Sequence, residues 1–415
     1  MKKKWMLAVC AVLTACLLSG CVFLPGSMLG GMLGQQSTGV VSDDGETVTI
    51  SREQYERYRQ FDDLLTLMDS ASEYYYQEPD LDAMLEGARA GVLAGLGDPY
   101  TFYYTPEQWT QMWEDDKGEY VGIGILISSS YQTGLCTVSR VFKGSPAEAA
   151  GMRRGDILYR VNEDLYVTYD TLQEAVNTMR GIPDTSVDVT VMRDGEEITF
   201  TMIRADINVN QVESTMLTED IGLIALYEFS GECQTEFENA LNALIARGAK
   251  GLIIDLRDNP GGWVDASQAI GDLFLDEGDL CTLVYRDGAE EHPYPTRDGK
   301  IEIPLVMLVN ENSASAAEIL TGALRDRAGA TVVGVTTYGK GIVQALATIG
   351  DKGAGFQMTI AEYLTPNGGH VHKTGLTPDV EIPLEEGDKG GYDFADAEKD
   401  PQLKKALEVM QEKLN

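Results

Sequence analysis

Three short segments in the second half of the chain carry residue types that suit nucleophilic chemistry. The segment 312–319, NSASAAEI, is rich in small side chains, and Ser315 lies where a predicted strand passes into a predicted helix. The positive end of the helix dipole favours negative charge at such a position. The segment 255–262, DLRDNPGG, ends in two glycines, whose backbone N–H groups can face a cleft. Ser315 is therefore a candidate nucleophile with space for a substrate to approach, and the glycines are candidate N–H donors.

A serine nucleophile needs a base, and Lys340 is the candidate. It lies in the third segment, 337–344, TYGKGIVQ, between two glycines and just after a predicted strand. Histidine is the usual base, but none of the chain's three histidines, His292, His370 and His372, has a comparable setting. Loss of solvent can lower a lysine pKa toward ~7 to 8, so that the neutral amine accepts the serine proton.

Each of these residues also has a simpler structural interpretation. Ser315 and Glu318 fit the Ser-x-x-Glu capping box, in which the serine only starts a helix. An isolated lysine is usually a solvated surface charge. His370 and His372, two apart in a predicted strand, share a face and could contact a metal. No cysteine lies near them and only one further histidine could join them, so no metal site is predicted. No cofactor is expected either.

Strands and helices alternate in the part of the chain that holds the three segments. They are predicted at 221–227, 236–247, 252–256, 305–309, 315–327 and 331–335. The continuous apolar strands among them are typical of a sheet covered on both faces. This alternation predicts an α/β core at 206–385, followed by a loop and a helix at 386–415.

The region before the core divides into a helical part and a β-rich part. Apolar residues recur at three and four positions within 51–116, which predicts helices there. Residues 117–205 change to strand periodicity, with an Asp194-Gly195 hairpin turn. The sequence therefore predicts an α+β multidomain protein.

The β-rich part at 117–205 has the features of a peptide reader. Gly-rich turns let consecutive N–H groups face one carboxylate, while the neighbouring strand edge pairs with an extended peptide. The series GSPA at 144–147, AG at 150–151 and GD at 155–156 resembles that of a PDZ domain. The peptide-binding residues expected from this resemblance are Tyr120, Val121, Gly122, Ile123 and Gly124. In isolation, the glycines of this last group would equally suit a bulge or tight packing in a strand.

The N-terminus predicts export and lipid attachment. Three lysines precede an apolar stretch from Trp5 to Leu18 that is too short to span a bilayer, so residues 1–20 are interpreted as a signal peptide. LSGC at 18–21 resembles a bacterial lipobox, which implies that Cys21 carries lipid and holds the protein at the extracytoplasmic side of an envelope membrane. An ordinary signal with an accidental cysteine is the alternative. Residues 21–50 are interpreted as a flexible tether.

Composition argues against one class of binding partner and against disulfide bonds. The formal charge is −34, with 66 acidic and 32 basic residues, which argues against a nonspecific grip on nucleic acid. Three widely spaced cysteines follow Cys21, an odd number that argues against a disulfide framework. Stability must then come from apolar burial. The helices before residue 117 and at the C-terminus could also serve as contacts of a homodimer.

The three segments, in this order after a PDZ-like domain, resemble those of the carboxyl-terminal processing (tail-specific) serine proteases. YLTPNG at 363–368, GLTPD at 375–379 and QLKKAL at 402–407 match the same family, and the similarity runs from about residue 87 to 407. The chain departs from the family at Trp263, where an aliphatic residue is common. This departure affects the expected substrate pocket rather than the chemistry.

The resemblance implies a role for each site residue. Ser315 would be the nucleophile and Lys340, 25 positions later, its base, with Gln344 orienting the lysine. The oxyanion hole would combine the backbone N–H of Ala316 with that of Gly261 or Gly262. The expected activity is that of a membrane-anchored serine endopeptidase that binds protein C-termini through its PDZ domain.

Two other functions remain open from the sequence. A noncatalytic PDZ lipoprotein scaffold would bind peptides without forming product, although it would have no use for Ser315, Lys340 and Gln344 together. A metal-dependent hydrolase would lose activity to a chelator, but the chain offers few ligands for it.

Overall fold

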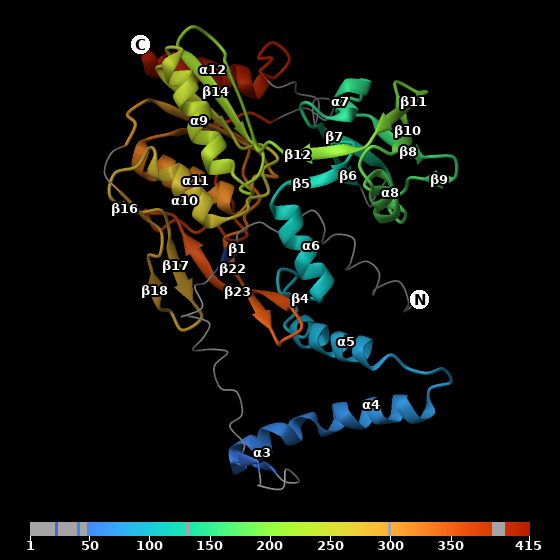
Figure 1. The fold of residues 1–415 in the computed structure, drawn as a ribbon. Coiled ribbons are helices and arrows are strands. Elements are labelled where there is room, and N and C mark those ends of the chain that lie inside the picture. The colour runs from blue at the N-terminus through green and yellow to red at the C-terminus, as the bar shows by residue number, and fades with distance from the viewer. Residues whose placement is uncertain (1–20, 24–39, 42–47, 130–132, 298–299, 384–394) are drawn as a thin grey trace. The chain divides into compact units, whose positions relative to one another are not determined.

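The computed structural model describes residues 21–23, 40–41, 48–129, 133–297, 300–383 and 395–415 (Figure 1). The predicted signal peptide, most of the tether and most of the loop after residue 385 lie outside the described residues. The chain divides into two compact units. One contains residues 111–343 and 361–415, and the other contains the described residues up to 110 together with 344–360.

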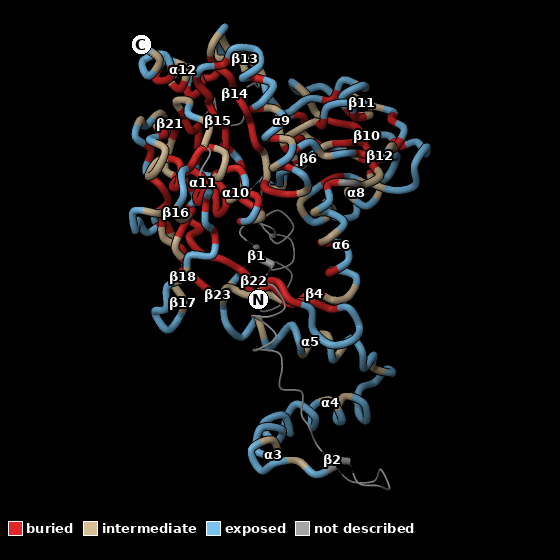
Figure 2. Tube along the Cα trace, turned by 60° about the vertical axis from the view of Figure 1, so that its left-hand side comes forward, coloured by how far each residue is buried: buried red, intermediate tan, exposed pale blue. Residues whose placement is uncertain are grey.

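The predicted N-terminal helices are present, but they form no core of their own. They are α3 (Arg52–Tyr58), a short 3-10 helix (Arg59–Phe61), α4 (Asp62–Tyr74) and α5 (Leu81–Ala94). Ser51 caps α3, because its side chain accepts a hydrogen bond from the Gln54 amide. None of the residues in these described helices is buried (Figure 2). Leu65 and Leu67 are among their exposed side chains.

Four short strands and one further helix lie before or after these three helices, in the described part of the chain ahead of residue 117. The strands are β1 (Cys21–Phe23), β2 (Val40–Val41), β3 (Val48–Thr49) and β4 (Phe102–Tyr104), and the helix is α6 (Pro106–Asp116). Strands β2 and β3 pair with each other, while β4 pairs with a later strand, β23. Among the described residues, no helix has the length and apolar composition that a membrane crossing requires.

The predicted β-rich domain forms an antiparallel sheet in the order β11-β10-β8-β7-β6, with β9 beside β8. Its elements are β5 (Glu119–Gly122), β6 (Ile125–Ser129), β7 (Cys136–Val141), α7 (Pro146–Ala150), β8 (Ile157–Val161), β9 (Leu165–Tyr166), α8 (Leu172–Met179), β10 (Ser186–Arg193) and β11 (Glu196–Ile203). The hairpin between β10 and β11 turns at Asp194 and Gly195, which both have positive φ, as predicted. Strand β6 ends the sheet order and so has one edge available to an added strand.

Buried apolar side chains and one ion pair hold this domain together. Val138, Leu158 and Val189 belong to its core. The Asp156 carboxylate is buried and accepts hydrogen bonds from Arg193 Nε at 2.6 Å and Nη2 at 2.7 Å. Such a two-point pairing offsets the cost of removing the carboxylate from water.

The α/β core is built on a six-stranded sheet in the order β13-β14-β15-β20-β21-β24. Its strands are β13 (Val212–Met216), β14 (Ile221–Leu226), β15 (Gly251–Asp255), β20 (Leu305–Val309), β21 (Thr331–Gly334) and β24 (Val380–Glu381). All neighbours from β14 to β24 are parallel, and every residue of β14, β15 and β20 is buried (Figure 2). The prediction from their continuous apolar runs is confirmed.

Helices cover both faces of this sheet. They are α9 (Cys233–Ala246), α10 (Val264–Asp272), α11 (Ala316–Ala328) and α12 (Pro401–Leu414). Leu403 and Met410 of α12 pack with Ile253 and Val306 on one face. On the other face, Leu244 of α9 lies so close to Gly222 that a Cβ there would reach within 2.9 Å of it.

A buried ion cluster fixes the start of α12 to the end of β15. Arg257 donates to Asp255 and to Asp400, with its Nη2 2.6 Å and 2.7 Å from one oxygen of each. Asp400 is also the N-cap of α12, where it accepts from the Leu403 amide at 3.0 Å. Since Arg257 precedes the two glycines by only a few residues, the C-terminal helix anchors the segment that contains them.

A second sheet follows Lys340. It contains β22 (Ile342–Ile349) and β23 (Ala354–Leu364), with β17 (Thr282–Tyr285) and β18 (Glu290–Glu291) beyond β23 and β1 beside β22. Short pairings elsewhere are β12 (Ala205–Asn208) with β5, and β16 (Gly278–Asp279) with β19 (Pro295–Thr296).

The predicted strand at the histidine pair is wrong. His370 makes only an isolated bridge with Leu364, and His372 lies in a turn. Positive φ at Gly368, Lys373 and Gly375 bends the backbone repeatedly here, so no extended run forms. No group of three or more His, Cys, Asp or Glu side chains in the described part of the chain is placed to hold a metal.

Candidate active site

Ser315 lies at the junction of β20 and α11, and its backbone is strained. Its φ is 55° and its ψ is −115°, values that a residue with a Cβ seldom adopts. The side chain has no exposed surface, and its Oγ has no hydrogen-bond partner among the described residues. A buried hydroxyl without a partner is unusual in a purely structural serine. Ser315 is also the N-cap of α11, with Glu318 as its capping-box partner, so the backbone starts the helix while the unpartnered Oγ leaves the hydroxyl open to a chemical role.

Glu318 joins the segment of Ser315 to the segment of Lys340. Its Oε2 accepts from the backbone N–H of Ser315 and of Lys340, both at 2.9 Å. The two amide nitrogens therefore lie no further apart than twice that distance. Its Oε1 accepts from the Gly339 amide at 2.8 Å and from the Thr337 hydroxyl at 2.5 Å. Burial raises the pKa of the Glu318 carboxyl, and these four donors partly offset the rise.

Lys340 is only 2% exposed, so it is not a solvated surface charge. The two glycines beside it are required by the close approach of residues 372–375. A Cβ on Gly339 would lie 2.8 Å from the Gly375 amide, and a Cβ on Gly341 would overlap the backbone of His372. Gly339 also has a φ of 86°. The Gly-Lys-Gly sequence thus lets this backbone turn pass against a neighbouring loop.

Gly261 and Gly262 approach the nucleophile with positive φ values of 107° and 129°. A Cβ on Gly261 would lie 2.9 Å from Ser315 Cβ and 3.0 Å from the Ala316 nitrogen, which leaves room only for glycine. The Gly261 amide donates to Asn259 Oδ1 at 2.8 Å. Among the described residues, no acceptor is found for the Gly262 amide or the Ala316 amide. These two N–H groups remain available to an oxyanion.

Gln344 lies on β22 and belongs to the other compact unit. It is fully buried, and its Nε2 donates to Thr359 Oγ1 at 3.2 Å. Its Oε1 has no partner among the described residues. The amide oxygen is therefore unused, as expected of a group that accepts from another side chain, and its role stays a prediction.

The five residues expected to bind peptide form β5 and the turn that leads into β6. Gly124 has a φ of 83°, and a Cβ there would overlap Ser145, whose Oγ donates to the Gly124 carbonyl. The Ala147 amide donates to the Ile123 carbonyl at 2.9 Å. The GSPA segment therefore holds the shape of this turn. Tyr120 contacts the Arg180 guanidinium, 4.8 Å from the ring centre.

Glu228 is a titratable residue of this region that the sequence analysis did not identify. It directly precedes Phe229, whose amide donates to the Gly261 carbonyl at 2.7 Å. Burial raises the pKa of Glu228 to about 7, although a hydrogen bond from Ser230 opposes the rise. Nothing in its local sequence distinguishes it from a surface glutamate, because the burial depends on the packing of β14 against later segments.

This shift predicts a pH dependence of stability. Below about pH 4.5 the carboxyl is protonated in both the folded and the unfolded chain; as the pH rises to about 7, the unfolded chain releases the proton first. The free energy of unfolding should therefore fall over this interval. Glu228→Gln should flatten the fall, as measured by urea unfolding at several pH values. An unchanged slope would contradict the shift, and Glu238→Gln on the exposed side of α9 is the matched control.

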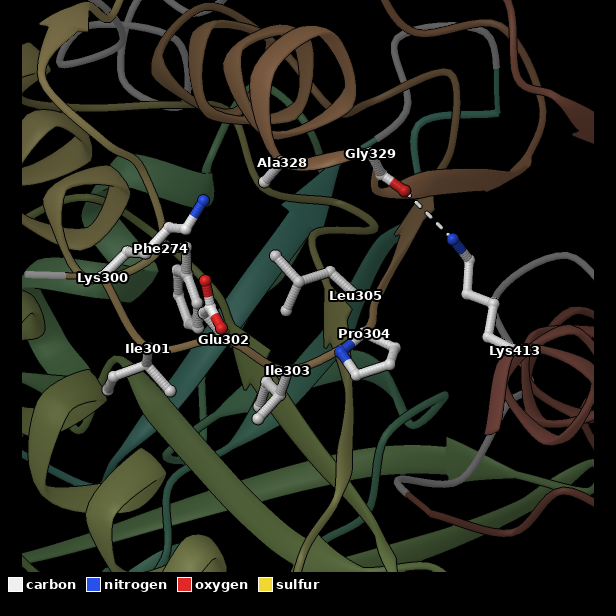
Figure 3. Close-up of a pocket in the computed structure, with 10 residues that line it drawn as sticks. All are labelled: Phe274, Lys300, Ile301, Glu302, Ile303, Pro304, Leu305, Ala328, Gly329 and Lys413. Carbon is white, nitrogen blue, oxygen red and sulfur yellow. Dashed lines mark hydrogen bonds between the residues drawn. The ribbon is translucent and has the colours of Figure 1, made fainter. Parts of the chain in front are cut away.

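A separate cavity of about 480 Å³ lies at the other end of α11 (Figure 3). Ala328 and Gly329, which end that helix, line it together with Pro304 and Leu305 at the start of β20. Ser315 is at the opposite end of both elements. None of the residues expected in the active site lines this cavity.

The antiparallel sheet with the glycine series of a PDZ domain, followed by an α/β core with a buried serine at a strand-to-helix junction, is the arrangement expected of a PDZ-bearing serine hydrolase. Comparisons with known proteins agree. Residues 121–203 match the PDZ domain family, and residues 220–382 match peptidase family S41. Carboxy-terminal processing protease CtpA of Bacillus subtilis is 35% identical over 338 residues, which cover 81% of this chain and 72% of that protein.

A second relative and a solved structure give the same assignment. A carboxyl-terminal-processing protease of Synechocystis is 37% identical over 301 residues, covering 71% of this chain and 70% of its own. The photosystem II D1 C-terminal processing protease structure matches with a TM-score of 0.54 and 27% identity, over 80% of this chain and 94% of that one. The chain belongs to peptidase family S41, the carboxyl-terminal processing proteases. The predicted family, fold class and serine peptidase activity are confirmed.

Proposed function

We propose that Ser315 and Lys340 perform the hydrolysis, with Gln344 orienting the lysine and the amides of Gly262 and Ala316 binding the oxyanion. The observation that carries this proposal is the Glu318 carboxylate, which binds the backbone of both residues at 2.9 Å. Burial of both side chains supports it as well. Gly261 contributes close packing against Ser315, since its own amide is bound by Asn259.

The chemistry follows in two steps. The neutral Lys340 amine takes the Ser315 proton as Oγ attacks the scissile carbonyl carbon, and the amides stabilise the negative oxygen. Collapse of this intermediate breaks the C–N bond, and the protonated lysine gives its proton to the leaving amine. Water then attacks the acyl-enzyme, losing a proton to Lys340, and Ser315 is released with its hydrogen restored.

An active-site label tests the assignment directly. A fluorophosphonate probe should form one adduct, on the peptide that contains Ser315, as identified by mass spectrometry. Lys340→Met should abolish this labelling, since the serine then has no base. Ser313→Ala is the control: Ser313 is equally buried, but its Oγ donates to the Leu256 carbonyl at 2.7 Å, so labelling should persist. An adduct on another residue, or full labelling without Lys340, would overturn the assignment.

The PDZ domain is proposed to bind free C-termini of protein substrates at residues 120–124. The shaped turn at Gly124 and the available edge of β6 support this role. Fluorescence anisotropy with the Ser315→Ala variant should show binding of an apolar-ended peptide and loss of binding when its C-terminus is amidated. Equal affinity for both peptides would contradict it.

Lipid attachment at Cys21 is proposed from the LSGC sequence, which would place the enzyme at the extracytoplasmic side of a bacterial envelope membrane. Cys21→Ser should move the protein from the membrane fraction to the soluble fraction. Retention of that variant by membranes would contradict the anchor.

Homodimer formation through the α3–α5 arm is also proposed. The arm exposes Leu65, Leu67 and Tyr74 and has no buried residue in the described structure, so a second arm would supply the missing cover. Sedimentation should give a dimer for the chain from residue 21 and a monomer for Leu65→Glu/Leu67→Glu. A monomer in both would contradict the pairing.

A further inference from the structure

Trp263, the residue that departs from the family pattern, makes two defined contacts with the end of α6. Its ring stacks on Trp113 with centroids 5.6 Å apart and planes inclined by 11°. Its indole Nε1–H donates to Asp116 Oδ1 at 2.5 Å. A hydrogen bond to a carboxylate is stronger and more directional than one between neutral groups. The side chain is therefore fixed in both position and rotation.

The same residue directly follows the oxyanion-loop glycines. Its backbone amide donates to the Phe229 carbonyl at 2.8 Å, and the Phe229 amide donates to the Gly261 carbonyl at 2.7 Å. A Cβ on Gly262 would overlap that Phe229 carbonyl, so Gly262 is held closely between the two. Fixing the Trp263 ring thus limits rotation of the peptide unit that carries the Gly262 N–H.

The electrostatic surroundings of Asp116 favour its hydrogen bond with the Trp263 indole. Asp116 is the last residue of α6, where the helix dipole disfavours a negative charge, and the two preceding residues, Glu114 and Asp115, are also acidic. Asp115 is paired with Arg180 at 3.1 Å. Asp116 is partly buried, and its carboxylate accepts a hydrogen bond from the Trp263 indole N–H. Breaking this bond would leave a partly buried carboxylate without that donor.

We propose that Trp263 is a positioning residue for the peptidase reaction, held by Trp113 and Asp116 so that the Gly262 N–H points at the oxyanion. This rests on the proposed function of Gly262. An oxyanion contact is made in the transition state and not with the bound substrate, so its loss lowers kcat and leaves KM nearly unchanged. A residue of the substrate pocket would instead change KM.

The test compares kcat and KM on an unstructured protein substrate. Trp263→Phe keeps a ring for Trp113 but cannot donate, and Asp116→Ala removes the acceptor. Each should lower kcat about 10-fold and change KM less than about twofold. This loss is smaller than that of removing an oxyanion donor completely, because the Gly262 N–H is still present but less well oriented. The double variant should be no worse than either single variant, since both break one interaction. Asp116→Asn, which keeps a carbonyl acceptor, should recover most of the rate.

Controls separate this inference from the function on which it rests. Glu114→Gln, the same charge loss on an exposed residue of α6, should retain the original kcat. Unchanged kcat in Trp263→Phe, a rise confined to KM, or additive losses in the double variant would each overturn the positioning role. Those results would leave Ser315 labelling intact, whereas failure of the proposed function would appear as labelling elsewhere.

Discussion

Replacing Lys340 with methionine should lower kcat for an unstructured protein substrate by at least about 10⁴-fold, comparable to the loss of a catalytic-triad member. Methionine keeps the length and the apolar stem of lysine in a site that is only 2% exposed, so packing changes little. It removes the amine that, in the proposed mechanism, takes the proton of Ser315. Steady-state cleavage followed by gel or mass spectrometry measures the change.

Three variants make this prediction specific. Lys340→Arg should be equally inactive, because a guanidinium does not deprotonate in this pH range. Ser315→Ala combined with Lys340→Met should be no slower than either single variant, since the two residues act as a unit. Lys250→Met, on an exposed lysine, should leave the rate unchanged. Substantial turnover in Lys340→Arg would show that the amine is not the base.

Replacing Glu318 with alanine should cost about 10²-fold to 10³-fold in kcat, on the scale of losing one oxyanion donor, and destabilise the fold by about 3 kcal/mol. The carboxylate accepts from three backbone amides and one hydroxyl that are all buried. Without it these donors lose their acceptor, and the direct link between the Ser315 and Lys340 amides is lost. The Tyr338 amide, which donates to the Ser313 carbonyl, still holds the two segments together less directly. Activity assays and urea unfolding measure the two effects.

A conservative variant and a control distinguish the effect of Glu318 on kcat from its effect on the free energy of unfolding. Glu318→Gln keeps one oxygen acceptor, so it should lose less activity than alanine, although its NH₂ group must face a donor. Thr321→Val, one turn further along α11, removes another buried side chain oxygen that donates to the Ala317 carbonyl. It should cost about 1 kcal/mol in stability with little change in kcat. Full activity in Glu318→Ala would contradict the bridging role.

Glu318 also illustrates what local sequence pattern does and does not encode. The Ser-x-x-Glu spacing correctly predicted that the Ser315 amide meets the Glu318 carboxylate at the start of a helix. It could not predict the bonds to Thr337, Gly339 and Lys340, because these come from a segment beyond the following strand. Their position depends on the parallel register of β20 and β21.

Strands β14, β15, β20 and β21 and the hairpin of the β-rich domain were predicted because each depends on short-range periodicity or turn chemistry, whereas β22 and β23 of the second sheet were not predicted. The histidine strand failed for the same reason: alternation at 370–372 suggested extension, while positive φ at Lys373 and Gly375 turned the chain. Helices α8 and α10 were not specified in advance. Their apolar spacing is short, and their stability comes from the elements on which they pack.

The amino-acid sequence alone determined the order of the domains, the buried strands and the spacing that places a serine, a lysine and two glycines in one family of peptidases. Only the tertiary structure decided which atoms of the site and its neighbours already make hydrogen bonds. The Gly261 amide donates to Asn259, and the Trp263 indole donates to Asp116. Periodicity and caps act within a few residues, whereas these hydrogen bonds require distant segments to be brought together by the packing of strands and helices.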